Sequence, residues 1–218
     1  MAFMPLLVDV TARCTEDMTD ELDLKNAALV LVDVQQGFRD PWWGRPSGLG
    51  TAYANITRLG RAWNDRGLPV VKVRHDSRNP ESPLYSGGPG NRFEAAIDAL
   101  SGDVLVTKTV NSAFLGTPDL ATWLRERGIS AIVVAGVQTN ACVETTARMG
   151  GNLGFSVTVP LDATATFDLE GPVLTGNSPL KLSAEELMRA TAVSLHGAGF
   201  ARVTETAAVL SSLDTAAP

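Results

Sequence analysis

The residue best suited to chemistry is Cys142, which lies in the stretch GVQTNACVETTA directly after the apolar run AIVVA. The run predicts a strand, and the stretch that follows predicts the first turn of a helix. A thiol becomes a good nucleophile when it loses its proton, and helix N-terminal amides and a nearby ammonium both favour the thiolate. The position of Cys142 therefore suits a nucleophile for acyl transfer.

Two charged residues also end predicted strands. Asp33 ends the run ALVLVD, and Lys108 ends the run VLVTK. The carboxyl ends of parallel strands meet at one edge of a sheet, where open α/β folds bind their ligands. There Asp33 could accept the thiol proton, and Lys108 could offset the rise in thiol pKa that a carboxylate alone would cause. The three residues thus form a coherent set for nucleophilic acyl transfer.

Each of these residues also has an ordinary structural interpretation. By residue type alone, a lone cysteine in an α/β domain is more often a small buried apolar side chain than a nucleophile. An aspartate at a strand end can cap the next turn, and a lysine is usually a solvated surface charge. Their joint placement at strand ends favours the catalytic interpretation.

Short apolar runs rich in β-branched residues alternate with longer amphipathic segments along the chain. Such runs are typical of parallel strands that are covered on both faces. With right-handed crossovers they predict a Rossmann-like, three-layer α/β/α sandwich with about six parallel strands. The strand before Cys142 is expected beside the strand before Asp33. The predicted strands span residues 28–34, 69–73, 104–107, 131–135, 155–159 and 201–204.

Three of the intervening segments carry helix signals. Residues 53–66 place apolar side chains on one face and end before Gly67, which suits the C′ position of a helix. Residues 117–127 begin with Thr117 as the expected N-cap and Pro118 as the first helical residue. The sequence SAEE is a capping box that predicts the start of a third helix near the C-terminus.

Two segments rich in proline, glycine and serine interrupt this alternation, at residues 39–50 and 76–90. Each follows a predicted strand, so both are candidates for loops that cover a site. Trp42 and Trp43 in the first loop could cap a ligand or a neighbouring subunit. Alternatively, they could pack against the surface of their own domain.

The composition excludes several classes of function. A net charge of −6 disfavours nucleic acid as a partner, and no apolar run reaches the roughly 20 residues that cross a bilayer. The N-terminal stretch lacks the basic region of a secretory signal, so we expect a cytoplasmic protein. Cys14 and Cys142 are expected as thiols, and the two histidines, His75 and His196, are few for a zinc site.

Four motifs carry a resemblance to a known family. They are D-x-Q-x-x-F at residues 33–38, K-x-x-x-S-A-F at 108–114, G-V-x-T-x-x-C-V-x-x-T at 136–146 and L-D-A at 161–163. In this order they resemble the isochorismatase-like cysteine hydrolases, the group of nicotinamidases, N-carbamoylsarcosine amidase and related amidohydrolases. The resemblance covers nearly the whole chain, and we expect an N-terminal arm over residues 1–26 and one hydrolase domain over residues 27–218.

The resemblance implies that Asp33, Lys108 and Cys142 form a catalytic triad. It also implies a cis peptide between Val137 and Gln138, and an oxyanion hole made by the backbone N–H groups of Gln138 and Cys142. Asp33 would take the thiol proton, and the thiolate would attack an amide carbonyl to give a thioester that water then cleaves. Lys108 would support the charges electrostatically.

The same resemblance implies a small-molecule amide substrate, no cofactor, and a homodimer or homotetramer. His75 could orient a substrate carbonyl or carboxylate, or it could be a structural histidine bonded to backbone. The side chains expected around the substrate are Phe38, Trp42, Trp43, His75 and Phe114.

The chain departs from the metal-binding nicotinamidases, which carry D-x-H after the second strand and another histidine downstream. Here that region reads VRHDS, and the next histidine is His196, so a metal site is not expected. The segment is more similar to the metal-free branch that includes streptothricin hydrolase, which opens a lactam. Cys142 favours amide hydrolysis over the vinyl-ether hydrolysis of relatives without the cysteine. Such an ether hydrolase and a non-catalytic oligomeric binding protein are the two alternatives.

Overall fold

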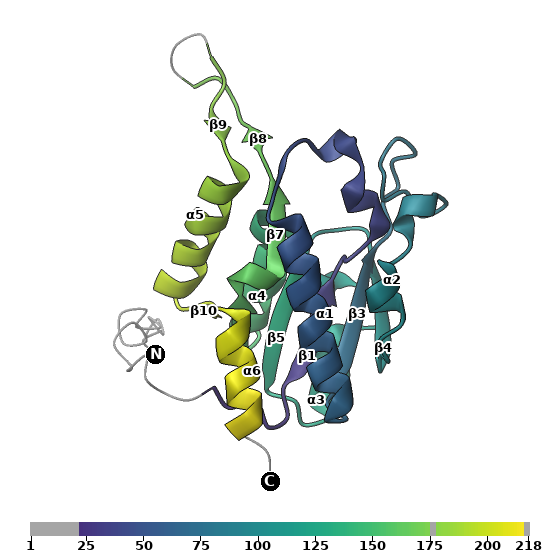
Figure 1. Cartoon of the computed structure of the whole chain (residues 1–218), viewed down its shortest axis with the longest axis vertical. Coiled ribbons are helices and arrows are strands. Elements are labelled where there is room, and N and C mark those ends of the chain that lie inside the picture. The colour runs from purple at the N-terminus through teal and green to yellow at the C-terminus, as the bar shows by residue number, and fades with distance from the viewer. Residues whose placement is uncertain (1–21, 175–177, 216–218) are drawn as a thin grey trace, which may run out of the picture.

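The central element of the fold is a parallel sheet (Figure 1). The computed structural model describes residues 22–174 and 178–215, and its main sheet follows the order β10-β6-β5-β1-β3-β4 with parallel neighbours throughout. β1 therefore lies between β5 and β3, which confirms that the strand before Cys142 lies beside the strand before Asp33. The strands of this path are β1 (Ala28–Val32), β3 (Val70–His75), β4 (Val104–Lys108), β5 (Ala131–Val137), β6 (Ser156–Pro160) and β10 (Arg202–Thr204).

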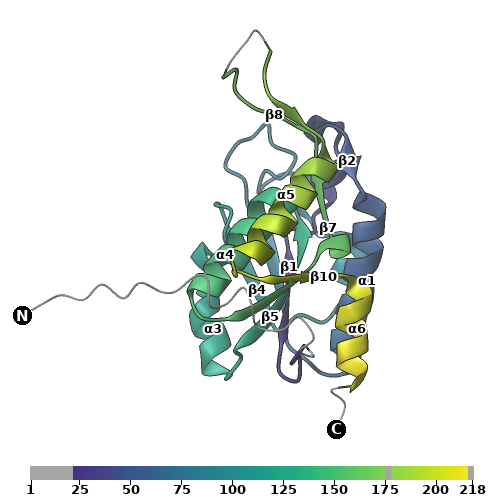
Figure 2. The ribbon, with the colours of Figure 1, turned by 90° about the vertical axis from the view of Figure 1, so that its left-hand side faces the viewer.

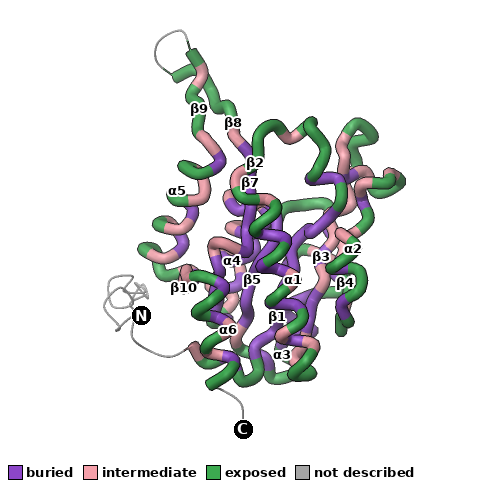
Figure 3. Tube along the Cα trace, in the orientation of Figure 1, coloured by how far each residue is buried: buried purple, intermediate pink, exposed green. Residues whose placement is uncertain are grey.

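Helices cover both faces of the sheet and complete the three predicted layers (Figure 2). The side chains of β1 alternate between two hydrophobic cores: Leu29 and Leu31 join one, and Val30 and Val32 join the other. This burial on both faces explains the continuous apolar run in the sequence, and Figure 3 shows the strands buried along most of their length. The first core includes residues of α1 (Leu49–Asp65) and α6 (Thr206–Thr215), and the second includes residues of α3 (Leu120–Glu126), α4 (Glu144–Asn152) and α5 (Ala184–Gly197).

Several short elements were not predicted from the sequence. β7 (Thr164–Phe167) pairs in parallel with the end of β5 and antiparallel with β2 (Pro46–Ser47). β8 (Leu169–Glu170) and β9 (Lys181–Leu182) form a hairpin that projects beyond the body of the molecule (Figure 1). The others are α2 (Ala95–Asp98) and the short turns η1 (Gln36–Arg39), η2 (Pro41–Trp43), η3 (Pro89–Asn91), η4 (Ala113–Leu115), η5 (Thr139–Val143) and η6 (Leu161–Ala163).

Two predicted helix starts differ from the structure. α1 begins at Leu49 rather than at Tyr53. The N-cap of α3 is Asp119, whose carboxylate accepts a backbone N–H of the first turn at 2.6 Å, so the prediction of Thr117 was wrong. The peptide between Thr117 and Pro118 is cis, and both residues lie before the helix. The capping box at the start of α5 is confirmed.

The predicted N-terminal arm lies mostly outside the described residues, and Cys14 lies there as well. Within the described part of the arm, Leu24 is 2% exposed and packs in the first core. Leu24 therefore belongs to the packed body of the domain. Across residues 22–174 and 178–215, no helix combines the length and apolar character that a membrane crossing requires.

Candidate active site

The two charged residues of the predicted triad form a buried ion pair. Asp33 directly follows β1 with a φ of 53°, and Lys108 is the last residue of the edge strand β4. The lysine side chain reaches inward past the end of β3, and its Nζ lies 2.6 Å from Oδ2 of Asp33. Both side chains are fully buried, so removing either one leaves the other as an uncompensated buried charge.

Cys142 approaches the same carboxylate from the strand on the other side. It lies in η5, a π-type turn that joins β5 to α4, and it is only 9% exposed. Its Sγ, a carboxylate oxygen of Asp33 and a ring nitrogen of His75 lie within 4.8 Å of one another. The structure therefore brings the three predicted catalytic residues together at the carboxyl edge of the sheet, with His75 beside them.

The two carboxylate oxygens of Asp33 have different surroundings. Oδ2 accepts the hydrogen bond from Lys108, whereas Oδ1 is buried and has no hydrogen-bond partner among the described residues. Leaving a buried acceptor unpaired costs about 1–3 kcal/mol. Oδ1 is thus available to accept a proton, and the Cys142 thiol, whose Sγ lies within 4.8 Å of a carboxylate oxygen of Asp33, is the candidate donor.

Burial changes the pKa values of the triad. Burial, together with the negative charge of Asp33, raises the pKa of the Cys142 thiol to about 12, and Lys108 opposes this rise only in part. Burial also raises the pKa of Asp33, against the effect of Lys108. The expectation that the resting protein favours a thiolate is therefore wrong. Cys142 is a neutral thiol near pH 7, and its reactivity requires a base.

The turn that carries Cys142 begins at the peptide between Val137 and Gln138, which is cis, as the resemblance implied. The carbonyl of Gln138 accepts the N–H groups of Ala141 and Val143 at 3.2 and 3.1 Å. Gln138 and Cys142 therefore lie at the two ends of one compact turn. The role of their backbone N–H groups as an oxyanion hole stays a prediction.

Strand β7 anchors this turn through hydroxyl groups. The hydroxyl of Thr139 donates to that of Thr164 at 2.9 Å, and the hydroxyl of Thr164 donates to the carbonyl of Leu161 at 2.8 Å. The hydroxyl of Thr166 donates to the side-chain oxygen of Asn140. Two residues of the turn are thus tied to a neighbouring strand, which restrains the position of the thiol.

His75, one of the predicted substrate contacts, interacts with the lysine of the triad. Its Nδ1 lies 3.2 Å from Nζ of Lys108. The side-chain amide of Gln35 accepts the backbone N–H of His75 at 2.9 Å and donates to its carbonyl at 3.1 Å. Burial and the charge of Lys108 lower the pKa of His75, which favours a neutral ring. This function of Gln35 was not foreseen, although the residue is the Q of the D-x-Q-x-x-F motif.

The predicted aromatic contacts lie largely in the hydrophobic cores. Phe38 and Phe114 are each 3% exposed, and Phe114 stacks on Phe155 with 5.6 Å between ring centroids. Trp43 is partly buried and packs against Phe38 at 4.8 Å, so it covers its own domain. Trp42 is 58% exposed and lies edge-on against Trp43. Of the predicted aromatic residues, Trp42 keeps the most surface for a ligand.

One residue beside the thiol was missed by the sequence analysis. Asn111 is exposed, and its Oδ1 lies 3.9 Å from Sγ of Cys142. It occupies a variable position of the K-x-x-x-S-A-F motif, so the pattern contained no signal for it. An exposed amide next to the nucleophile can hydrogen-bond to a substrate.

Asp33, His75 and Cys142 also carry atoms that can bind a metal ion. However, the Lys108 ammonium already contacts the Asp33 carboxylate at 2.6 Å and the His75 ring at 3.2 Å. A divalent ion bound to the same donors would lie against this positive charge. The donor set is therefore better suited to an organic substrate than to a metal.

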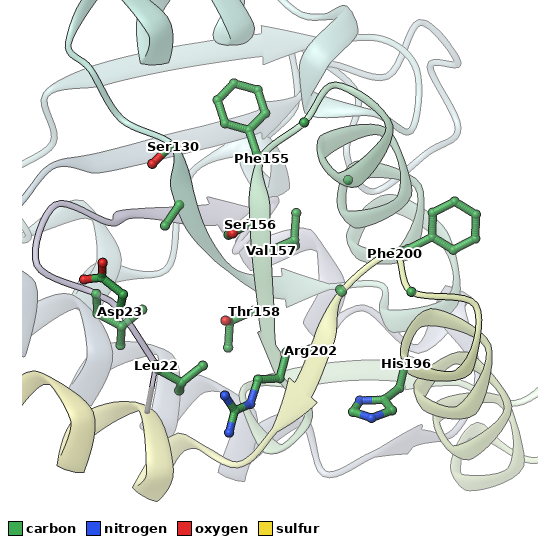
Figure 4. Close-up of a pocket in the computed structure, with 16 residues that line it drawn as sticks. Leu22, Asp23, Ser130, Phe155, Ser156, Val157, Thr158, His196, Phe200 and Arg202 are labelled. Carbon is green, nitrogen blue, oxygen red and sulfur yellow. The ribbon is translucent and has the colours of Figure 1, made fainter. Parts of the chain in front are cut away.

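A separate cavity of about 700 Å³ opens at the amino ends of β5 and β6 (Figure 4). Its walls include Phe155, Thr158, His196 and Arg202, and no triad residue. Nδ1 of His196 accepts the backbone N–H of Val203 at 3.3 Å, which holds the ring against the start of β10. Because open α/β sheets bind ligands at the carboxyl ends of their strands, this cavity is not the candidate active site.

The family described as Isochorismatase domain matches residues 27–192 of this chain. The uncharacterized isochorismatase family protein YrdC of Bacillus subtilis is 37% identical over 142 residues, which cover 65% of this chain and 75% of YrdC. Ureidoacrylate amidohydrolase RutB of Methylobacterium radiotolerans is 32% identical over 66% of this chain and 68% of RutB. Streptothricin hydrolase of Streptomyces noursei is 30% identical over 72% of this chain and 62% of that enzyme.

Solved structures share the same fold. The crystal structure of a hydrolase of the isochorismatase family from Chromobacterium violaceum is 35% identical in sequence and matches with a TM-score of 0.80. The match covers 92% of this chain and 100% of that structure. The likeness therefore extends well beyond the sheet edge that carries Asp33, Lys108 and Cys142.

Proposed function

Because this chain belongs to the isochorismatase family of hydrolases, we propose that it is a cysteine amidohydrolase that cleaves a small carboxamide, ureido compound or lactam through a Cys142 thioester. Two relatives support this range of substrates by their names, one a ureidoacrylate amidohydrolase and one a streptothricin hydrolase. Asp33 serves as the base and Lys108 as electrostatic support. No cofactor is required by this scheme.

One observation carries the proposal. The buried oxygen Oδ1 of Asp33 has no hydrogen-bond partner among the described residues, while Oδ2 is held by Lys108. The thiol beside this carboxylate has a pKa raised to about 12, so it cannot act as a nucleophile without losing its proton to a base. The Asp33 carboxylate, with one oxygen bonded to Lys108 and the other without a partner among the described residues, provides such a base within the same buried site.

The reaction follows from these positions. Oδ1 of Asp33 takes the proton of Cys142 as Sγ attacks the carbonyl carbon, and the N–H groups of Gln138 and Cys142 stabilise the oxyanion. The C–N bond then breaks, and Asp33 returns its proton to the leaving nitrogen. Water attacks the thioester and gives a proton to Asp33. The C–S bond breaks, the acid departs, and Asp33 reprotonates the thiolate. Lys108 stays charged throughout and balances each anionic state.

The test is trapping of the acyl enzyme. The protein is mixed with nicotinamide, N-carbamoyl amino acids, small aliphatic amides and streptothricin-like lactams, quenched in acid and examined by intact-mass spectrometry. We expect an acyl adduct on Cys142 with a turned-over substrate, and none in Cys142→Ala. Release of ammonia or amine is measured in parallel.

Two outcomes would contradict the proposal. Wild-type kcat in Cys142→Ala would rule out covalent catalysis by this thiol, whereas turnover of a vinyl ether but of no amide would favour the ether-hydrolase alternative. Absence of turnover across the panel, together with unaltered protein mass, would favour a non-catalytic binding protein.

We further propose that the enzyme works as a homodimer or homotetramer in the cytoplasm. A catalytic thiol is best maintained in a reducing compartment, which supports the location. The assembly is an expectation from the family resemblance. Light scattering after size-exclusion chromatography tests it, and a mass equal to the 23.0 kDa chain would contradict it.

A further inference from the structure

We propose that His75 is a positioning residue for this reaction, whose neutral ring holds the Lys108 ammonium in place while Asp33 is protonated. The inference rests on the proposed function, because it concerns the same triad. It gives His75 a task different from the predicted contact with substrate. The argument depends on what happens to Lys108 during the catalytic cycle.

Among the described residues, the oxygen of Asp33 and the ring nitrogen of His75 both lie within hydrogen-bond distance of the Lys108 ammonium. Its Nζ donates to Oδ2 of Asp33 at 2.6 Å and lies 3.2 Å from Nδ1 of His75. Since an ammonium can only donate, Nδ1 must be the unprotonated nitrogen of the ring. The side chain of Lys108 is fully buried, so solvent cannot replace an acceptor that is lost.

In the proposed mechanism one of these acceptors, the Asp33 carboxylate, becomes weaker. When Asp33 takes the thiol proton it becomes neutral, and the charge-assisted bond to Lys108 weakens. The negative charge has then moved to Cys142 and the substrate, and the ammonium is drawn towards them. The ring of His75 does not change charge in this step. It therefore provides a constant acceptor that keeps Nζ at the strand end.

The backbone fixes the place of His75. In the register of β3 and β4, His75 is paired directly with Lys108. Gln35, which is fully buried, bonds to both backbone groups of His75, and the amide of Asn91 donates to the His75 carbonyl at 2.9 Å. These bonds do not involve the imidazole. The ring can therefore be replaced while the bonds that hold its backbone remain available.

The charges around the ring favour its neutral form. Lys108 faces it from β4, Asp33 from β1 and Cys142 from η5, and Asp76 beside it is paired with Arg74 at 2.8 Å. Protonation would place two cations 3.2 Å apart and remove the acceptor. Desolvation and Lys108 lower the pKa of His75, consistent with this arrangement.

Two variants of similar size test the role. His75→Asn places an amide oxygen near the position of Nδ1 and can accept from Lys108, whereas His75→Leu fills the same space without an acceptor. Both are made with Cys14→Ser, so that Cys142 is the only cysteine. The readouts are the rate of Cys142 alkylation by iodoacetamide at pH 7.5, which needs no substrate, and kcat and KM on an amide that is turned over.

We expect His75→Leu to lower the alkylation rate and kcat by about tenfold or more, since Lys108 then supports the thiolate less well, with little change in KM. His75→Asn should stay within about threefold of the wild type in all three values. Equal losses in the two variants would overturn the proposal. If alkylation separates the variants but no amide is turned over by the wild type, the positioning role stands and the proposed function fails.

Should His75→Leu fail to fold, the tautomer of the wild-type ring gives an independent test. The chain contains only two histidines, so ring ¹⁵N spectra of the wild type and of His196→Gln assign both. We expect Nδ1 of His75 to be unprotonated at pH 7. A proton on Nδ1 would exclude it as an acceptor for Lys108 and would overturn the proposal.

Discussion

At the scale of the residue, the proposed reaction depends on the carboxylate of Asp33 to activate the thiol of Cys142. The thiol of Cys142 has a pKa raised to about 12 by burial and by the negative charge of Asp33. One oxygen of the carboxylate accepts from Lys108, and the other has no hydrogen-bond partner within the described part of the chain. The resting thiol is therefore protected against unspecific alkylation, and the proposed reaction transfers its proton to Asp33 during attack on a substrate.

Alkylation of Cys142 by iodoacetamide should accordingly be slow at pH 7 and should rise with pH. Below a pKa of about 12, the thiolate fraction increases about tenfold per pH unit. The rate is followed by mass spectrometry of the Cys142 peptide between pH 7 and 9, in Cys14→Ser, with N-acetylcysteine as the reference thiol. A rate that reaches a plateau near pH 7 would show that the thiol pKa is low.

A double variant distinguishes the contribution of the Asp33–Lys108 ion pair to stability from the contribution of Asp33 to the reaction. Asp33→Asn leaves Lys108 as an uncompensated buried charge, which should lower the free energy of unfolding by about 3–5 kcal/mol. It should also lower kcat by about 10²–10⁴-fold, since the base is lost. Combining it with Lys108→Met should restore most of the stability, measured by urea unfolding, but not the activity.

The control for this pair is Asp168→Asn, which breaks an exposed contact with Arg45 and can still accept the backbone N–H of Ala184 through its amide oxygen. Such contacts contribute about 0–1 kcal/mol, and Asp168 is outside the triad. Recovery of activity in the double variant would show that Asp33 is not the base.

At the scale of the element, the sequence predicted what depends on local patterns. The strands of the main sheet were found because their apolar runs are buried on both faces, and Asp33 and Lys108 were found because they end such runs. The contact of His75 with Lys108 was missed because it depends on the register of two strands. β7 was missed because it follows β6 after only one short turn and pairs with the last residues of β5.

Gly136 shows how tightly β5 fits beside β1. Its φ is +141°, and a Cβ at this position would lie 2.0 Å from the backbone oxygen of Val32. Gly136→Ala should therefore destabilise the protein by more than about 4 kcal/mol, which is exceptional for one substitution. Gly197→Ala near the end of α5 is the control, because a Cβ there meets nothing within 4 Å. Thermal unfolding measures both, and equal melting temperatures would contradict the prediction.

The hydroxyl ties between β7 and the turn of Cys142 allow a second prediction. Thr164→Val keeps the shape of the side chain but removes its bonds to Thr139 and to the Leu161 carbonyl. We expect a loss of about 1–3 kcal/mol in unfolding free energy, and a lower kcat because the turn is less restrained. The same substitution at Thr204 on β10 is the control. An unchanged kcat in Thr164→Val would show that the turn holds its geometry without β7.

At the scale of the whole molecule, the carboxyl edge and the amino edge of the sheet, where the strands end and begin, carry different groups. The carboxyl edge gathers the buried charges, the thiol and the loop of Trp42. The amino edge holds the cavity beside His196 and Arg202, without triad residues. This division follows from the parallel topology, which sends every strand end of one kind to the same edge. The proposed reaction would thus take place at one end of the molecule.

The position of Lys108 at the end of an outer strand has a consequence for heat inactivation. Among the described strands β4 pairs with β3 alone, and its outer side carries one isolated bridge, between Thr107 and Thr117. Outer strands open at a lower free energy than central ones. Backbone amides of β4 should therefore exchange with deuterium faster than those of β1, and heating should abolish turnover before circular dichroism records unfolding. Coincident loss of both signals would contradict this. The enzyme would lose its charge balance while most of its fold is still intact.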